Sequence, residues 1–365
     1  MASHFFGDCL RMTTWGESHG PAIGVVIDGC PAGLALCVDE IQQALNQRRP
    51  GQTEFVTARQ ESDEVQLLSG VYRGFTTGTP ISLLIHNQDV QSQTDEQQEH
   101  ILRPSHAHYS YLSKFGVMDT RGGGRSSARE TACRVAASVV AKKILETVGV
   151  DTCAYLQQVD EFNCDPCSVY DATLKHKIDS DIIFCPDKTV SLKIQSLLMQ
   201  IRKEGDSIGG VVGFATTPLP VGLGEPVYSK LEAVLASALM GLPASKGFEL
   251  GDGFLLAHQR GSKSNDLFTF ENNQVKTRTN HGGGTLGGIS YGMPLWGRVV
   301  FKAASRLGIS QESITLTGQP AIYPGYLSPR HDPCVAVRAV PVVNAMLAFV
   351  LADFVLRDRL SRIFR

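Results

Sequence analysis

The chain has 365 residues, of which 42% are hydrophobic and 19% are charged, and its formal net charge is −2. A chain of this length can bury a large core, and its composition is that of an ordinary globular protein. The near-neutral charge argues against bulk binding to nucleic acid or to a membrane surface.

Periodic patterns predict a mixture of strands and helices. The mixture lacks regular βαβ spacing, so we expect an α+β arrangement rather than a doubly wound sheet. The predicted elements, in chain order, are a strand at 22–28, a helix at 39–49, a strand at 81–86, a helix from 128 to about 148, a helix at 189–204, a strand at 210–216, a helix at 229–242, a strand at 297–301 and a helix at 334–360. Residues 88–100 are interpreted as an exposed loop, and residues 153–186 as irregular and peripheral to the chemistry.

Two segments of the chain resemble each other. Residues 16–27 (GESHGPAIGVVI) and 205–214 (GDSIGGVVGF) each begin with a glycine, an acid and a serine and then run into a β-branched strand. A glycine cluster also occurs in each half, at 122–124 and at 282–288. We therefore expect two similar halves, with a chance likeness between glycine turns as the alternative.

The N-terminus shows no signal or transit pattern, and the apolar run that comes closest to a membrane span is interrupted. That run covers residues 335–356 and contains Arg338 and Asp353. The nine cysteines are odd in number and scattered, which is typical of a reducing cytosol. Cys164 and Cys167 have metal-like spacing, but no second close pair completes a zinc site, so we expect no metal and a cytoplasmic protein.

The most informative stretch is 121–134, RGGGRSSARETACR, which contains four arginines. A glycine loop followed by serines and a helix N-terminus forms an anion site, because the first N–H groups of a helix are unpaired and its dipole favours negative charge. From 101 to 143 there are eight Lys and Arg residues and two acids. The pattern predicts a small polyanionic ligand, with a long nucleic acid as the alternative.

Two histidines occupy turns that could serve proton transfer. His19 lies in GESHG before a strand, and His106 lies in RPSHAHY before the glycine loop. Near an anion site, the charged form of His106 would be favoured. For each histidine alone a surface turn is the competing interpretation.

Two further motifs leave alternatives open. The glycine loop lacks the Lys-Ser/Thr of a P-loop, which argues against ATP hydrolysis. Gly282, Gly284 and Gly287 have the spacing of a dinucleotide fingerprint, and a nicotinamide-dependent oxidoreductase is therefore a second hypothesis, although no hydrophobic strand precedes these glycines. Asp332, in RHDPC before the last predicted helix, is either a helix cap or a carboxylate base among cations.

Taken together, the motifs GESHG, RPSHA, RGGGRSSARET and RHDPC closely resemble the chorismate synthase family, in family order from Arg11 to about Leu347. RRPG from Arg48, GTPISLLIHNQD from Gly78, GDG from Gly251 and GGISYGMP from Gly287 add to the resemblance. The resemblance implies one domain over residues 1–365, folded as a β-α-β sandwich with helices enclosed between antiparallel sheets, and a homotetramer.

The resemblance also implies a reaction in the shikimate pathway to aromatic amino acids. It is the 1,4-anti elimination of phosphate from 5-enolpyruvylshikimate 3-phosphate, which gives chorismate and requires reduced FMN without net redox change. The protein would be a carbon–oxygen lyase acting on phosphates, with the flavin supplying the electronic chemistry and the chain supplying orientation and charge.

Residue roles follow from the matched motifs. His106 would protonate the reduced flavin, His19 would protonate the departing phosphate, and Asp332 would help to move the proton. Ser18 and Ser127 would support this relay. The remaining implied contacts are FMN at Arg125, Ser126, Ser127, Ala244, Gly287, Lys302, Ala303, Ala304, Ser305, Arg306 and Arg330, and substrate or NADP at Arg48 and Arg129, with Arg330 also holding substrate.

The chain departs from the family pattern in several places. Glu54 stands where an arginine is common, which argues against direct NADP contact and favours an external flavin reductase, with NADPH as an indirect reductant. His108 replaces a usual aspartate and Asn344 a common glutamate, and Lys302 is the one residue of 302–306 that carries over firmly.

Overall fold

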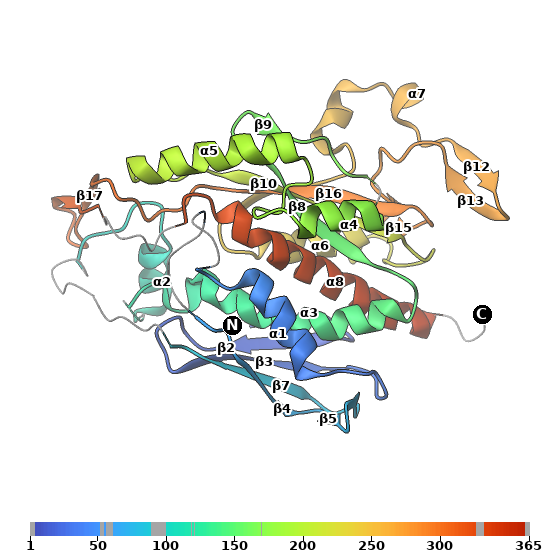
Figure 1. The fold of residues 1–365 in the computed structure, drawn as a ribbon, viewed down its shortest axis with the longest axis horizontal. Helices are drawn as coiled ribbons and strands as arrows, with labels where there is room; N and C mark the ends of the chain where they lie inside the picture. The colour runs from blue at the N-terminus through green and yellow to red at the C-terminus, as the bar shows by residue number, and fades with distance from the viewer. Residues whose placement is uncertain are drawn as a thin grey trace.

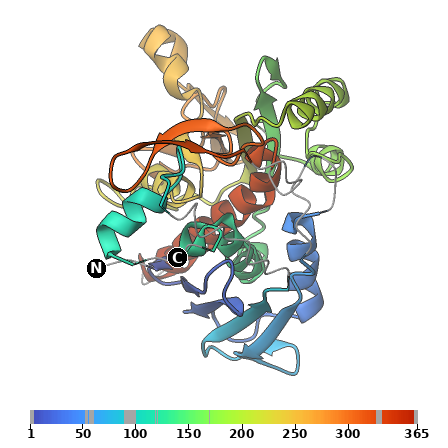
Figure 2. The same ribbon diagram turned by 90° about the vertical axis from the view of Figure 1, so that its left-hand side faces the viewer.

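Two five-stranded antiparallel sheets enclose a layer of helices in the computed structural model of the chain (Figure 1). The structure describes residues 4–51, 55, 61–88, 100–117, 119, 121–168, 170–325 and 332–361. Seen from the end of the molecule, the two sheets lie on either side of α3 (Thr131–Glu146) and α8 (Val335–Ser361) (Figure 2), whereas α5 (Lys188–Glu204) lies outside the second sheet (Figure 1). This is the predicted α+β sandwich.

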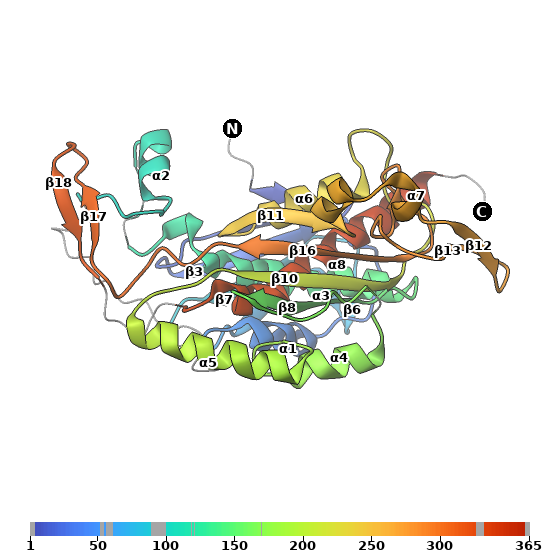
Figure 3. The same ribbon diagram turned by 90° about the horizontal axis from the view of Figure 1, so that it is seen from above.

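The first sheet has the order β1-β2-β3-β7-β4 and the second the order β11-β16-β10-β8-β9. In the view from above, the strands of the second sheet lie side by side, and small hairpins project from both ends of the molecule (Figure 3). The strands of the first sheet are β1 (Phe5–Phe6), β2 (Arg11–Trp15), β3 (Ala22–Asp28), β4 (Val65–Ser69) and β7 (Ile81–His86). Those of the second are β8 (Thr152–Val159), β9 (Phe162–Asn163), β10 (Gly210–Pro218), β11 (Ser245–Leu250) and β16 (Pro294–Phe301). The hairpins are β5 (Val71–Tyr72) with β6 (Phe75–Thr76), β12 (Phe268–Glu271) with β13 (Gln274–Thr277), β14 (Thr285–Leu286) with β15 (Ile289–Ser290), and β17 (Gln311–Ile314) with β18 (Pro320–Tyr323).

The helices are α1 (Val38–Arg48), α2 (His108–Phe115), α3 (Thr131–Glu146), α4 (Ala172–Asp179), α5 (Lys188–Glu204), α6 (Leu231–Met240), α7 (Gly261–Ser264) and α8 (Val335–Ser361). Short 3-10 turns lie at η2 (Gly124–Ser126), η3 (Ala128–Glu130) and η4 (Gly253–His258). Helices α3 and α8 are buried on nearly all sides, because a sheet covers each face of the layer that they share with α1 and α6.

Small residues allow α3 and α8 to pack closely. Ala136 and Ala141 of α3 and Ala348 and Ala352 of α8 are fully buried. By length and composition α8 could cross a membrane, but 83% of its most apolar window is buried inside the protein. Its apolar surface therefore belongs to the core, where residues of both sheets and of the helices form one hydrophobic cluster.

Asp353 is the charged residue among the buried side chains of α8. Its Oδ1 atom accepts hydrogen bonds from the backbone N–H groups of Cys9 (2.7 Å) and Leu10 (2.8 Å), which fixes the N-terminal segment to the central helix. Burial raises the pKa of this carboxyl group. Asp353, which interrupts the apolar run of residues 335–356, thus ties the N-terminal segment to the last helix.

The two halves have matching layouts. The GESHG turn leads into β3 and the GDSIGG turn leads into β10, and each of these strands is the middle strand of its five-stranded sheet. A long buried helix follows the strands of the first sheet in sequence, and another follows those of the second. The expectation of two similar halves is confirmed at the level of topology.

Most of the predicted elements are present, but one interpretation was wrong. Residues 153–186 were expected to be irregular, yet β8 pairs with β10 inside the second sheet, and α4 follows it. The strand is buried on both faces, so the alternation of polar and apolar residues that marks a half-exposed strand is missing. Helix α2, which begins at His108, was not predicted either.

Candidate active site

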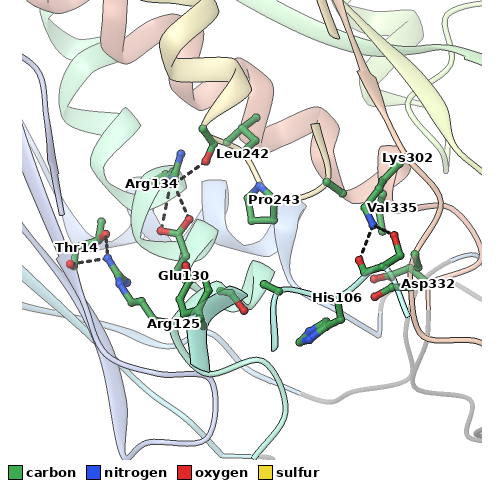
Figure 4. A pocket seen from close by; sticks show the side chains of 18 of the residues that line it. Thr14, His106, Arg125, Glu130, Arg134, Leu242, Pro243, Lys302, Asp332 and Val335 are labelled. Carbon is green, nitrogen blue, oxygen red and sulfur yellow. Dashed lines mark hydrogen bonds and ion pairs between the residues drawn. The ribbon is translucent and has the colours of Figure 1, made fainter. Parts of the chain in front are cut away.

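A cavity of about 740 Å³ opens where the two halves meet (Figure 4). Its size falls within the usual range for small-molecule sites. Segments distant in sequence converge on it, and the residues that line it include Met12, Thr14, Arg103, Ser105, His106, Tyr111, Arg125, Ser126, Glu130, Arg134, Leu242, Pro243, Ala244, Lys302, Ala303, Ala304, Ser305, Arg306 and Asp332.

Arg125 forms a cationic corner of the cavity. Its Nη2 atom donates to the Thr14 carbonyl oxygen (2.7 Å) and to Thr14 Oγ1 (2.5 Å) on β2. Its Nη1 atom is buried and has no hydrogen-bond partner among the residues that the structure describes. A buried donor that lacks a partner costs free energy, so this atom is suited to an anionic ligand.

The glycine loop supports His19 from behind the cavity wall. A Cβ atom on Gly122, whose φ is +68°, would lie 2.2 Å from His19 Cε1, so a glycine is required there. Ser18 Oγ lies 2.9 Å from His19 Nδ1, and the Ser18 N–H donates to the Gly124 carbonyl (3.3 Å). His19 and Ser18 are thus fixed to the loop, and neither lines the cavity itself.

The two serines of the loop have structural contacts. Ser126 Oγ donates to the Gly123 carbonyl (2.7 Å), and Ser127 Oγ accepts from the Arg129 N–H (3.3 Å) as the cap of η3. Ser126 lines the cavity, whereas Ser127 does not.

His106 lies in a turn anchored from the second sheet. Ser105 has a φ of +56°, and Lys302 Nζ donates to its carbonyl oxygen (2.7 Å) and to its Oγ (2.5 Å). The His108 N–H donates to His106 Nδ1 (3.2 Å), so Nδ1 is an acceptor and the neutral ring carries its proton on Nε2.

The charge state of His106 differs from the sequence-based expectation. Burial, followed by the nearby Arg103, His108 and Lys302, lowers the pKa of His106 to about 3. The cations that make the cavity an anion site oppose a further positive charge while no anion is bound. In the protein alone, the neutral imidazole is therefore favoured.

Lys302 to Arg306 and Ala244 line the cavity together, as the motif match implied. The Lys302 N–H donates to the Ala244 carbonyl (2.9 Å), and Ala244 has a φ of +69°. Gly287 lies in the turn between β14 and β15 and is not among the residues that line the cavity. Arg330 and Glu54 lie outside the described residues.

Asp332 faces the cavity as a paired carboxylate. Its Oδ2 atom lies 2.9 Å from Arg338 Nη1 on the first turns of α8. The helix itself begins at Val335, so the side chain is placed at the N-terminal end of α8 beside the cavity.

Arg48 and Arg129 lie beneath the glycine loop and share one carboxylate. Arg48 Nη1 lies 3.1 Å from Asp63 Oδ2, and Arg129 Nη1 pairs with Asp63 Oδ1. Burial lowers the pKa of Arg48 to about 10. Neither guanidinium lines the cavity.

The motifs did not assign Glu130 to the site. Glu130 and Arg134 both line the cavity, and Arg134 Nη2 lies 2.8 Å from Glu130 Oε1 and 3.2 Å from the Gly241 carbonyl. The motif match assigned no role to Arg134 either. The spacing of four residues between an acid and an arginine is the signal that could have identified the pair.

The fold argues against the dinucleotide hypothesis. The glycines at 282–287 lead into the short β14–β15 hairpin instead of opening a helix, whereas a Rossmann fingerprint requires the N-terminus of a helix for the pyrophosphate.

Comparisons with known proteins agree with the sequence motifs. The sequence profile of the chorismate synthase family matches residues 10–356. The chain is 48% identical to the chorismate synthase of Protochlamydia amoebophila over 368 residues, which cover all of both chains. It is 46% identical to the chorismate synthase of Parabacteroides distasonis over 352 residues, covering 96% of this chain and 97% of that one. A crystal structure of a chorismate synthase superposes with a TM-score of 0.76 at 27% identity and covers 98% of each chain.

The low pKa of His106 predicts a pH dependence of stability. The pKa of about 3 in the folded protein lies below the ordinary histidine pKa of 6.5, so between these pH values the unfolded chain binds a proton that the folded chain does not. Stability should therefore fall as the pH drops from 6.5 towards 3, by at most about 1.4 kcal/mol per pH unit. Denaturant titrations at several pH values should show a shallower slope for His106→Gln than for the wild type. The exposed His100→Gln serves as control, and an NMR titration midpoint of His106 near its ordinary value would contradict the prediction.

The contact between Gly122 and His19 predicts a specific effect of Gly122→Ala. The new Cβ should push the imidazole out of place, and the loop should lose the Ser18–His19 contact. Gly116→Ala is the matched control, since Gly116 also has a positive φ (+75°) but nothing lies within 4 Å of its ideal Cβ. We expect the His19 ring resonances to shift in Gly122→Ala and to stay in Gly116→Ala; unchanged resonances in both would argue against the packing.

Proposed function

The chain belongs to the chorismate synthase family, whose members are carbon–oxygen lyases acting on phosphates, and we propose the complete reaction from this premise. The proposed reaction is the 1,4-anti elimination of phosphate from 5-enolpyruvylshikimate 3-phosphate to give chorismate, with reduced FMN bound and without net redox change. It is the family's step in the shikimate pathway towards aromatic amino acids.

The observation that carries this proposal is the convergence of cations and a histidine on one cavity. The substrate is a phosphate with two carboxylates, and the cofactor carries another phosphate. Arg125 from the glycine loop, Lys302 and Arg306 from the second half, and Arg103 beside His106 all line the same space of about 740 Å³. Arginine forks and lysine ammonium groups are the side chains that bind such anions.

The residues of the cavity fit FMN. The buried Nη1 atom of Arg125, which no described residue satisfies, is suited to an anionic group, and the open backbone around 302–306 can lie against a flat ring. We assign Arg125, Ser126, Ala244 and residues 302–306 to this role. Ser127, Gly287 and Arg330 stay predictions from the motif match. When bound, reduced FMN supplies the electron density that assists cleavage of the carbon–oxygen bond.

The chain supplies orientation and proton transfer. His106, with its proton on Nε2, is the proposed donor on the flavin side, and His19 is the proposed donor to the departing phosphate. Asp332, held by Arg338, takes part in moving the proton, and Ser18 beside His19 supports the relay with Ser127. General acids of this kind contribute roughly 10²- to 10⁴-fold to a rate.

We propose that the arginines that line the cavity contact the substrate anions directly. Arg48 and Arg129 lie outside the cavity lining, beneath the glycine loop. In this structure the guanidiniums of Arg48 and Arg129 are engaged by Asp63, which supports indirect use of NADPH through an external flavin reductase. The assignment of Arg48 and Arg129 to direct substrate or NADP contact stays a prediction.

We propose a homotetramer of single-domain chains that works in the cytoplasm. One continuous core supports the single domain, and nine free cysteines are compatible with a reducing compartment. Exposed apolar side chains on the β12–β13 hairpin and on η4, among them Phe254, Phe268 and Phe270, are suited to contacts between subunits.

The reaction is tested under anaerobic conditions. Wild-type protein with dithionite-reduced FMN and 5-enolpyruvylshikimate 3-phosphate should release one phosphate for each chorismate formed, followed by absorbance and a phosphate assay. Folded protein that releases no phosphate would overturn the proposal. We expect His106→Ala and His19→Ala to lose turnover by about 10²-fold or more while FMN binding changes little. The exposed His258→Ala should retain activity, and parallel losses of binding and turnover would indicate structural roles.

The partnerless Nη1 atom of Arg125 predicts a separate effect on cofactor binding. Arg125→Ala should weaken FMN binding by about tenfold to a hundredfold, because it removes a charge-assisted hydrogen bond. Arg121→Ala is the control in the same loop, since Arg121 is exposed and paired with Asp119 at 2.9 Å. Fluorescence titration of FMN should separate the two variants; equal affinities would place the flavin phosphate elsewhere.

A further inference from the structure

A second cavity, of about 310 Å³, lies apart from the proposed active site. Helices α1, α3, α4 and α8 and strand β8 surround it, and none of its lining residues also lines the larger cavity. The polar members of its wall include three lysines and four acids, namely Lys142, Lys143, Lys175, Glu40, Glu146, Asp151 and Asp179.

Most of these charges are paired with each other. Lys143 pairs with Glu40 and lies 3.7 Å from Glu146. Lys175 lies 2.8 Å from Asp179. These pairs account for two of the lysines and three of the acids, so Lys142 and Asp151 are the opposite charges that remain.

Lys142 is a half-buried lysine whose side chain lines this cavity. Among the described residues it has neither a hydrogen bond nor an ion pair, and burial lowers its pKa. Asp151 exerts the strongest attraction on it, although no ion pair joins the two groups. A half-buried cation without a protein partner is suited to pair with an anionic group that enters the cavity.

Asp151 is held in place but keeps acceptor capacity. It accepts a hydrogen bond from the Thr152 N–H through Oδ1 (2.7 Å) and one from the Tyr170 hydroxyl through Oδ2 (3.0 Å). An ionised carboxylate has about four lone-pair sites, so both oxygens can accept a further donor from the cavity.

The uncharged part of the wall is mixed. Val139, Ala154, Ile178 and Val340 are buried around the cavity and form an apolar stretch of its wall, and Phe184 lies at its edge. Polar side chains also line it, among them Gln43, Gln47, Thr152, Tyr170 and Asn344. The space therefore combines a cation that no described residue pairs with, a carboxylate with spare acceptor capacity and an apolar stretch of wall, and its volume is at the lower end of the range for small-ligand sites.

We propose that this cavity binds the zwitterion of an α-amino acid with an apolar side chain. The carboxylate of the ligand pairs with Lys142 Nζ, its ammonium pairs with Asp151, and its side chain packs against Val139 and Ile178. A zwitterion places its two charges close together on one small molecule, so it compensates both groups at once without a net charge being buried.

The test uses isothermal titration of the full chain with L-leucine and L-phenylalanine. Two analogues of leucine each lack one charge: L-leucinamide lacks the carboxylate, and 4-methylpentanoate lacks the ammonium. We expect saturable binding of at least one amino acid and about tenfold or greater loss for both analogues.

Variants locate the site. Lys142→Met and Asp151→Asn should each weaken binding by about tenfold or more, and both conserve side-chain volume. Lys177→Met, at an exposed position of α4, should bind as the wild type does. The proposal is overturned if neither amino acid saturates the chain below about 10 mM, or if Lys142→Met binds with unchanged affinity. The phosphate released in the reaction of the larger cavity is measured in a separate assay. The outcome of that assay does not decide whether the second cavity binds an amino acid.

Discussion

The packing of α3 against α8 between the two sheets is the constraint on which the rest of the structure depends. Both helices run from the cavity towards the opposite end of the molecule (Figure 1). Their middles are buried on all sides and are apolar, with small residues such as Ala136 and Ala348 beside larger ones such as Phe349. Polar chemistry is therefore confined to their ends. The N-terminal ends of both helices meet at the cavity, and helix N-termini favour anions.

This arrangement explains why the site is built from both halves of the chain. The first half brings the glycine loop and the His106 turn, and the second half brings Lys302 and Asp332. The halves are coupled directly, because Lys302 holds the Ser105 turn that carries His106. Asp353, at the other end of the core, ties the N-terminal segment to α8. A change in how the halves pack would therefore alter the position of His106.

The sequence predicted the parts of the fold and site that depend on local pattern. Strands β3 and β7 were predicted with the bounds that the structure has, because a β-branched run marks them. Strand β8 was missed, since burial on both faces removes the alternating pattern. The motifs identified several residues that line the cavity, such as His106, Arg125 and Lys302, but no motif could show that Asp63, distant in sequence, engages both Arg48 and Arg129. Pairing across the fold is a property of packing, and a linear pattern does not contain it.

The electrostatics of His106 show how such packing governs chemistry. Arg103 and Lys302 make the cavity attractive to anions, and burial together with these same charges favours the neutral imidazole while no anion is bound. An anion that enters the cavity offsets those charges, so it favours protonation of the ring that is proposed to act as an acid. By linkage, protonation of His106 must strengthen anion binding to the same extent. The protonated form is therefore more populated with the anions in place than without them, which couples proton transfer to occupancy of the site.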